Sequence, residues 1–198
     1  MMLLKWKLVK TIMKNSIIKK LDNPKTKEYN ILKQEIHSMN FMWKYLEHST
    51  DPSADQEGFS NIPMYQHPIV ASPDAKEEFL IPVVESKYAE IAFQVIRQIF
   101  SYNNIEYNQI YRCVVNQIHY YDGNPSPPHV DHYTWDHKNC LIYLNSFDDG
   151  EIDVYDDDGK LQRYKPLEDD IITFDGLYHS VHQPASKQRR ITIVITYS

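Results

Sequence analysis

The sequence predicts one α+β domain that is mainly β, a sandwich or jelly roll of short strands supported by N-terminal helices. The length of 198 residues is enough for one substantial core and too short for two. Two segments with helical spacing precede residue 107, and short β-branched and aromatic runs separated by turn residues follow it. We therefore expect a single domain over 1–198, with a helical and loop part over 1–106 and a β core over 107–198.

The composition is that of a folded, acidic protein. Hydrophobic residues make up 42% of the chain, which argues against wholesale disorder. The net charge of -6 removes the attraction that drives binding to nucleic acids or anionic membranes, so we expect no broad nucleic-acid binding. No apolar stretch approaches the roughly 20 residues of a membrane span. The two cysteines, Cys113 and Cys140, lie in apolar runs, which favours free thiols and a reducing, cytoplasmic location.

The first 21 residues, "MMLLKWKLVKTIMKNSIIKKL", differ from this acidic balance, because they hold six lysines and no acidic residue. A membrane-surface helix or a targeting segment is one interpretation. An ordinary first strand or helix of the domain is favoured over it, since the segment lacks arginine and the clean apolar region of a signal peptide. A protein that acts through this basic N terminus is kept as a rival hypothesis.

The N-terminal part predicts two helices and a long loop. Residues 26–37 place apolar side chains at helical spacing behind Thr26, which is a good N-cap. Residues 85–100 repeat apolar side chains more strongly and should pack against a sheet. Between them, residues 49–74 hold four prolines among polar residues, which predicts a long loop around the short segment "IPMYQHPIV".

The C-terminal part predicts mostly strands. Six apolar runs are separated by turn residues, at 109–121, 139–145, 151–155, 160–164, 170–174 and 190–197. "DDDGK" at 156–160 predicts a hairpin turn with Asp158 and Gly159 as its central pair. A calcium loop at these aspartates is disfavoured, because the spaced ligand pattern and the closing glutamate are absent.

Candidate metal ligands follow a proline pair in "PPHVDHYTW", residues 127–135. A single residue separates His129 from Asp131, so in an extended chain both side chains point to the same side. Downstream, "FDGLYHSVHQP" offers His179 and His182 as a third ligand. Two histidines and one carboxylate on a β scaffold, with open coordination positions, form the facial triad of non-haem ferrous oxygenases.

A basic residue is available to balance the charge of a co-substrate. Iron centres of this kind use a doubly anionic, bidentate co-substrate, and its distal carboxylate must be paired with a cation if it is buried. Arg190 opens the last predicted strand, and Thr192 follows on the same face as a hydroxyl donor. The charges of a ferrous ion, Asp131, a dicarboxylate and Arg190 sum to zero, which a pocket of low dielectric tolerates.

These segments together resemble a known family. "YYDGNPSPPHVD", "CLIYLN", "YKPLEDDIITFDGLYHSVHQP" and "RRITIVITY" are similar to the iron(II)- and 2-oxoglutarate-dependent dioxygenases of the prolyl-4-hydroxylase-like branch, from about Arg112 to Tyr197. "FMWKYL" at 41–46 faintly resembles an N-terminal element of versions carried by marine phages. The abundance of Asn, Lys, Ile and Tyr is typical of an AT-rich genome, which fits a viral protein in the host cytoplasm.

The resemblance implies a fold, a reaction and a set of ligands. The fold is a double-stranded β-helix, cupin-like, and the reaction hydroxylates a substrate with O2 while 2-oxoglutarate becomes succinate and CO2, with ascorbate as an accessory reductant. Fe(II) is expected on the catalytic residues His129, Asp131 and His179. The co-substrate is expected to contact five residues, which are Asn116, Tyr120, Tyr143, Arg190 and Thr192.

Alternatives remain for several of these residues. His179 is favoured over His182, and Arg190 over Arg189, because the family register matches better. Tyr120 and Tyr143 also fit as core aromatics, and a cross-strand hydrogen bond explains Asn116 equally well. The family often has glycine where this chain has Asp169, so the turn at that position is expected to be built differently.

The substrate is the least determined feature. A prolyl or other peptide side chain is favoured, while small molecules and nucleobases are hydroxylated by related proteins. Residues 49–74 and 132–139, which include His132, Trp135 and His137, are the expected walls of the substrate site. Rival functions are a cupin-like metal-dependent hydrolase or isomerase and a non-catalytic jelly-roll binding module. The sequence indicates no oligomeric state.

Overall fold

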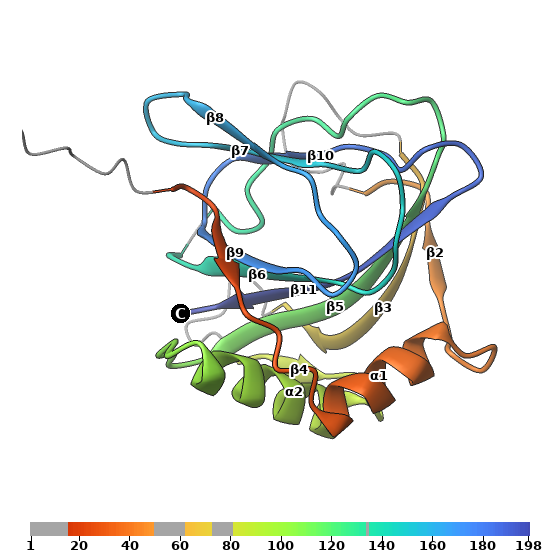
Figure 1. Ribbon diagram of the computed structural model, residues 1–198, viewed down its shortest axis with the longest axis vertical. Coiled ribbons are helices and arrows are strands. Elements are labelled where there is room, and N and C mark those ends of the chain that lie inside the picture. The colour runs from red at the N-terminus through yellow and green to blue at the C-terminus, as the bar shows by residue number, and fades with distance from the viewer. Residues whose placement is uncertain (1–15, 50–61, 73–80, 134) are drawn as a thin grey trace, which may run out of the picture.

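The structure is a computed structural model of the chain, and it describes residues 16–49, 62–72, 81–133 and 135–198. Two antiparallel sheets face each other, and two helices lie on the outer side of the larger sheet (Figure 1). This arrangement confirms the predicted α+β, mainly β architecture with supporting N-terminal helices. None of the helices in the described ranges is long and apolar enough to cross a bilayer.

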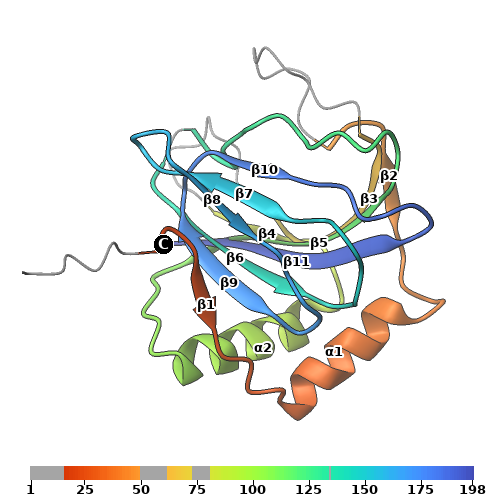
Figure 2. The same cartoon turned by 45° about the horizontal axis from the view of Figure 1, so that its top comes forward.

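The larger sheet has eight strands in the order β1-β9-β6-β11-β5-β3-β2, and β4 pairs with β3. Its strands are β1 (Lys19–Leu21), β2 (Lys44–Leu46), β3 (Met64–Ala71), β4 (Val83–Val84), β5 (Ile110–His119), β6 (Lys138–Tyr143), β9 (Ile171–Asp175) and β11 (Arg189–Tyr197). The smaller sheet has the order β10-β7-β8 and lies over the larger one (Figure 2). Its strands are β7 (Ile152–Tyr155), β8 (Leu161–Tyr164) and β10 (His179–Val181).

The two helices are α1 (Lys27–His37) and α2 (Ala89–Tyr102). α1 begins where predicted, because the Thr26 hydroxyl accepts a hydrogen bond from the Tyr29 backbone N–H at 3.2 Å. α2 begins four residues later than predicted. The preceding residues form a turn in which the Ser86 hydroxyl accepts from the Tyr88 backbone N–H at 3.1 Å. Both helices bury their apolar faces against the larger sheet.

Alternation along the central strands separates a structural face from a functional face. In β11, Ile191, Ile193 and Ile195 belong to the apolar cluster under the helices. Two residues that alternate with them, Arg190 and Val194, face the smaller sheet and line a cavity between the two sheets. β5 follows a similar alternation, because Arg112, Asn116 and Ile118 line that cavity while Cys113 and Val115 belong to the cluster. The sheet therefore presents one apolar face to the helices and one partly polar face to the interior.

The segment expected to be a long loop over 49–74 contains strand β3 instead, among its described residues. β3 pairs with β5 from Met64↔Ile118 onward, and the pairing shifts between Pro68 and Val70. β2 and β10, with three residues each, were also not predicted, whereas β1 lies at the end of the segment that was expected to form a first strand or helix. The part of the chain before residue 107 is therefore helix, loop and strand. Residues 1–15, which carry most of the basic N terminus, and residues 50–61 lie outside the described ranges.

The hairpin between β7 and β8 forms as predicted, with a different central pair. The Gly159 backbone N–H donates to the Asp156 carbonyl at 2.8 Å, so Asp157 and Asp158 are the central residues of the turn. Gly159 follows with a φ of +75°, and register resumes at Tyr155↔Leu161. The loop is five residues long, and a glycine after the turn is typical of such longer hairpins.

Candidate metal centre

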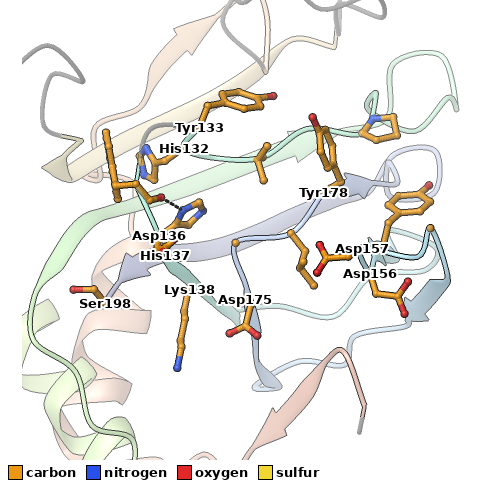
Figure 3. Close-up of a pocket in the computed structure, with 17 residues that line it drawn as sticks. His132, Tyr133, Asp136, His137, Lys138, Asp156, Asp157, Asp175, Tyr178 and Ser198 are labelled. Carbon is orange, nitrogen blue, oxygen red and sulfur yellow. Dashed lines mark hydrogen bonds between the residues drawn. The ribbon is translucent and has the colours of Figure 1, made fainter. Parts of the chain in front are cut away.

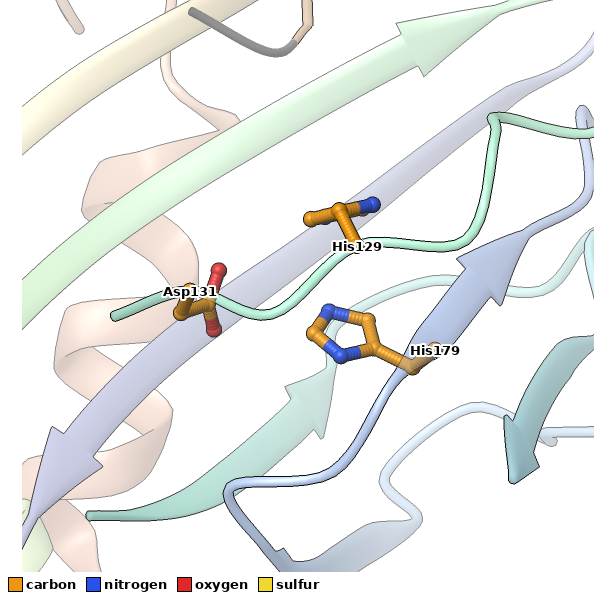
Figure 4. Close-up of side chains that lie close together, drawn as sticks. All are labelled: His129, Asp131 and His179. Carbon is orange, nitrogen blue, oxygen red and sulfur yellow. The ribbon is translucent and has the colours of Figure 1, made fainter. Parts of the chain in front are cut away.

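Three side chains from two distant segments meet between the sheets. His129 and Asp131 lie on the segment between β5 and β6, and His179 is the first residue of β10 (Figure 4). The backbones of His129 and His179 donate hydrogen bonds to each other in both directions at 2.9 Å, so two residues fifty positions apart in the chain are joined by one bridge. One potential ligand atom from each of the three residues lies within 4.8 Å of the others. The histidine and aspartate pattern predicted from the sequence is thus assembled in space.

Each histidine is oriented by a carbonyl two residues earlier in the chain. The His129 Nδ1 lies 3.0 Å from the Pro127 carbonyl oxygen, and the His179 Nδ1 lies 3.0 Å from the Leu177 carbonyl oxygen. Because a carbonyl can only accept, Nδ1 carries the hydrogen in both rings and donates it. The Nε2 lone pairs are then left for a metal, as in histidine ligands that are fixed by a hydrogen bond on the other nitrogen.

Arg112 holds the third ligand. Its Nη1 donates to the Asp131 Oδ1 at 3.2 Å, and both side chains are largely buried. Burial raises the pKa of Asp131, but the positive charge of Arg112 and the nearby imidazoles outweigh burial and lower the pKa overall. Burial, followed by the charge of His129, lowers the pKa of His179 to about 4. A carboxylate and neutral imidazoles are the forms that bind a divalent cation, so the residues fit Fe(II).

A second cation lies in the same interior without a counter-ion. The Arg190 side chain is only 2% exposed, and in the described residues it forms no ion pair. Its Nη2 donates to the Tyr143 hydroxyl at 3.4 Å, and its guanidinium carbon lies 5.1 Å from the centre of the Tyr143 ring. The Arg190 Nε and the Thr192 hydroxyl are buried without a hydrogen-bond partner among the described atoms. A buried, unpaired guanidinium fits a bound carboxylate.

One cavity of about 80 Å³ joins these groups. The triad, Arg112 and Arg190 all line it, and its apolar walls are Ile62, Met64, Ile118, Leu141, Ile152, Val181 and Val194. On β5 and β11, Arg190 is opposite Ile118 and Thr196 is opposite Arg112. Six residues along a strand span roughly 20 Å, so the two arginine side chains extend into the cavity from opposite ends of this pair of strands. The triad is beside the Arg112 end.

The other residues predicted to contact a co-substrate occupy three different environments. Asn116 lines the cavity, and its side-chain carbonyl accepts from the Gln66 side chain at 3.1 Å, which is the expected cross-strand bond. Tyr143 is fully buried and accepts a hydrogen bond from Arg190, which lines the cavity. Tyr120 is 48% exposed and does not line the cavity. The contacts of these residues and of Thr192 with a co-substrate stay predictions.

The alternative ligands point elsewhere. His182 is not part of the triad, and its Nε2 lies 2.9 Å from the Asp153 carboxylate. Arg189 donates to the Gln117 side chain at 3.4 Å and does not line the cavity. The preference for His179 and Arg190 therefore agrees with the geometry.

Two residues of the site were missed in the sequence. The contact of Arg112 with Asp131 was not foreseen. The side-chain carbonyl of Gln183 accepts from three consecutive backbone N–H groups, those of Tyr121, Asp122 and Gly123, at 2.6, 3.1 and 3.3 Å. Gln183 thereby folds the loop before the metal ligands. No local pattern indicates either contact, because each joins segments about twenty to sixty residues apart.

The turn at Asp169 keeps the backbone of a glycine-type position. Asp169 has a φ of +68°, in the left-handed region that glycine favours. Its carboxylate accepts from the Tyr29 hydroxyl at 2.6 Å, and it pairs with Lys33 at 2.5 Å and Lys25 at 2.9 Å. The expected difference from the family thus lies in the side chain, which ties this turn to α1.

A family model and solved structures were compared with this chain. Residues 116–197 match the family model of the 2OG-Fe(II) oxygenase superfamily. No curated protein gives a significant match.

Two solved structures are similar over most of the chain. An oxidoreductase of the 2OG-Fe(II) oxygenase family from Burkholderia pseudomallei is 16% identical with a TM-score of 0.60, and the match covers 86% of this chain and 77% of that one. A prolyl hydroxylase from Trichoplax adhaerens, in complex with a peptide fragment of the hypoxia inducible factor oxygen degradation domain, is 13% identical with a TM-score of 0.54. That match covers 92% of this chain and 84% of the other. The sequence resemblance is confirmed: the segment with the triad matches the 2OG-Fe(II) oxygenase superfamily, and the chain shares the jelly-roll fold of these enzymes, prolyl hydroxylases among them.

Proposed function

We propose that this protein is an Fe(II)- and 2-oxoglutarate-dependent dioxygenase that hydroxylates a peptide side chain, with proline as the first candidate, and releases succinate and CO2. The observation that carries the proposal is the buried Arg190, which has no counter-ion in the described residues and lines the same cavity as the triad. A metal site alone does not require such a cation. A dicarboxylate that chelates the metal and extends toward β11 does.

Each residue has a defined task in this proposal. His129, Asp131 and His179 hold the ion, and the Arg190 guanidinium pairs with the distal carboxylate of 2-oxoglutarate. The unpartnered Thr192 hydroxyl supplies a further donor. The bound iron and 2-oxoglutarate supply the oxidation, in which one oxygen atom of O2 enters succinate and the other enters the hydroxylated product. The apolar walls of the cavity keep bulk water away from the reacting groups.

A peptide substrate is supported by the Trichoplax adhaerens prolyl hydroxylase, whose structure contains a bound peptide fragment. A small-molecule substrate is the alternative within the same reaction. We further propose a reducing, cytoplasmic compartment, because Cys113 and Cys140 are both buried free thiols.

The decisive experiment combines a spectrum with a product assay. Adding Fe(II) and 2-oxoglutarate without oxygen should produce the visible charge-transfer band of a chelated co-substrate, and oxygen with ascorbate should then release succinate. We expect Asp131→Ala to lose both signals and Arg190→Met to lose the band at 2-oxoglutarate concentrations that saturate the wild type.

The chain offers matched controls a few residues away. His182→Asn and Arg189→Met remove the same side-chain types outside the cavity, so both should keep the band and the succinate release. A cupin-like hydrolase would bind the metal but give no band. Absence of the band in the wild-type protein, or a band of normal strength in Asp131→Ala, would refute the proposal.

A further inference from the structure

A second hollow lies on the opposite side of the metal-binding segment. It has a volume of about 1070 Å³, and we call it the acidic groove (Figure 3). Its walls include Tyr133, Trp135, Asp136, Asp157, Asp175 and Tyr178. Val130, between two metal ligands, and Tyr178, directly before His179, also line it, because alternate side chains of an extended segment point to opposite sides. Among the described residues, none lines both the acidic groove and the metal cavity.

The charge of the groove selects a cation. Asp136, Asp157 and Asp175 are exposed, and in the described part of the chain they form no ion pair. Of the described residues that line the groove, Lys138 is the single lysine or arginine. Most carboxylates on a protein surface are simply solvated, so the charge alone does not identify a site.

A buried and unpartnered polar side chain in the wall is the second observation. His137 is 7% exposed, and its Nδ1 donates to the Trp135 carbonyl oxygen at 3.2 Å. The Nε2 is therefore an acceptor, and it has no partner among the described atoms. The Trp135 indole N–H also has no partner among the described atoms. Gly176 is required here, since a Cβ would lie 2.7 Å from the His137 ring.

Aromatic rings complete the wall. Tyr133 and Tyr178 are 55% and 51% exposed, although large aromatic side chains are costly to leave in water. His132 stacks on Trp135 with ring centres 4.3 Å apart. Aromatic faces beside carboxylates attract lysine and arginine side chains through combined cation–π and ionic contacts.

We propose that the acidic groove binds a polypeptide segment that carries lysine or arginine, and that it anchors a peptide substrate next to the metal centre. The second half of this statement rests on the proposed function. A peptide, rather than a simple amine, is favoured because carboxylates and aromatic rings lie along one extended hollow, which matches a chain that carries several side chains. The volume also accommodates several residues, and the negative charge disfavours nucleic acid.

Fluorescence anisotropy tests the binding directly. The probe is a fluorescein-labelled twelve-residue peptide of glycine, proline and four lysines, and the reference peptide has glutamate at the four lysine positions. With the full chain at low salt, we expect the lysine peptide to bind and the glutamate peptide not to bind. The double variant Asp157→Asn/Asp175→Asn should weaken binding by about fivefold or more, since two unpaired carboxylates are lost.

A matched double variant distinguishes the effect of the groove carboxylates on peptide affinity from the effect of net charge. Glu90→Gln/Glu106→Gln removes two exposed carboxylates outside the lining of the groove and should leave the affinity unchanged. Equal weakening by both double variants, equal binding of the two peptides, or no binding of the lysine peptide would overturn the proposal. Asp131→Ala should bind the peptide like the wild type, so loss of oxygenase function and loss of groove binding are read independently.

Discussion

His129 and His179 are oriented by the same local contact, a hydrogen bond from Nδ1 to the carbonyl two residues earlier. This contact lies within each segment, so the ligand geometry of each ring is set before the two segments meet. Asp131 differs, because its position depends on Arg112 from the neighbouring strand β5. In the proposed metal centre, one carboxylate oxygen is held by Arg112 and the other binds the metal.

Replacing Arg112 should therefore weaken metal binding. We expect Arg112→Met to lower the affinity for Mn²⁺ by about tenfold or more, the size of effect seen for groups that hold a metal ligand, and Arg112→Lys to lose less. Titration calorimetry measures the affinity, with Arg97→Met on the exposed side of α2 as the control. Unchanged Mn²⁺ affinity in Arg112→Met would show that Asp131 is positioned by other contacts.

At the scale of secondary-structure elements, the turns between strands position the residues that line the cavity. Gly150, in the turn before β7, has a φ of +70°, and a Cβ there would lie 2.7 Å from the Phe147 ring and 3.4 Å from the Arg190 side chain. Gly159, in the β7–β8 hairpin, has a φ of +75° and no atom within 4 Å of a Cβ. The two glycines share a backbone requirement, and only the first is also packed against the site.

Substituting each of these two glycines distinguishes the cost of backbone strain from the cost of steric crowding. Gly159→Ala should cost about 1 kcal/mol of unfolding free energy from the left-handed backbone alone. Gly150→Ala should cost about 2–4 kcal/mol, because the methyl group also displaces the Phe147 ring. Urea denaturation measures both values. Equal losses of unfolding free energy in the two variants would show that the Phe147 ring moves aside freely. A raised KM for 2-oxoglutarate in Gly150→Ala would show that the added methyl group displaces the Arg190 side chain.

The turn at Asp169 predicts a pH dependence. Burial alone would raise the pKa of Asp169, but hydrogen bonds from Lys33, Tyr29 and Lys25 lower it to about 2. The unfolded carboxyl titrates near its ordinary value of about 3.9, so the unfolded state takes up the proton first as the pH falls. The contribution of these contacts is therefore complete above about pH 5 and is lost between about pH 4 and pH 2.

Asp169→Asn isolates this contribution. The variant retains a side chain that tolerates a positive φ, and it should be about 1–2 kcal/mol less stable than the wild type at pH 7. The difference should shrink toward zero as the pH approaches 2, and denaturant unfolding at several pH values measures it. A difference that stays constant with pH would mean that the ion pairs with α1 contribute nothing to stability.

At the scale of the whole molecule, we expect metal binding to stabilise the fold, because the candidate ligands come from two segments that meet only in the folded chain. A cation that binds the native state at one hundred times its Kd adds about 2.7 kcal/mol to the unfolding free energy. For a domain of this size that is a Tm increase of about 5–10 °C. We expect Mn²⁺ to produce this increase in the wild type and no increase in Asp131→Ala, as measured by thermal scanning. An equal increase in both would place the bound metal outside the triad.

Local spacing was enough to predict some elements and not others. α1 was predicted to the residue at its N terminus, because the cap and the apolar stripe are local. β3 was read as loop, since Pro68 and the polar residues around it suit a loop, and only pairing with β5 makes the segment a strand. β10 has three residues, which is too short for a pattern to appear.

The sequence by itself determined the class of fold, the two helices, the main strands and the pair His129 and Asp131, because a period of two or of 3.6 residues is written into neighbouring side chains. It also brought His179 and Arg190 into consideration through motifs in the expected order. Only the tertiary structure decided which histidine completes the triad, that Arg112 holds Asp131 and that an acidic groove lies behind the metal-binding segment. Those contacts depend on strand register between distant segments, and register is fixed when the two sheets pack together.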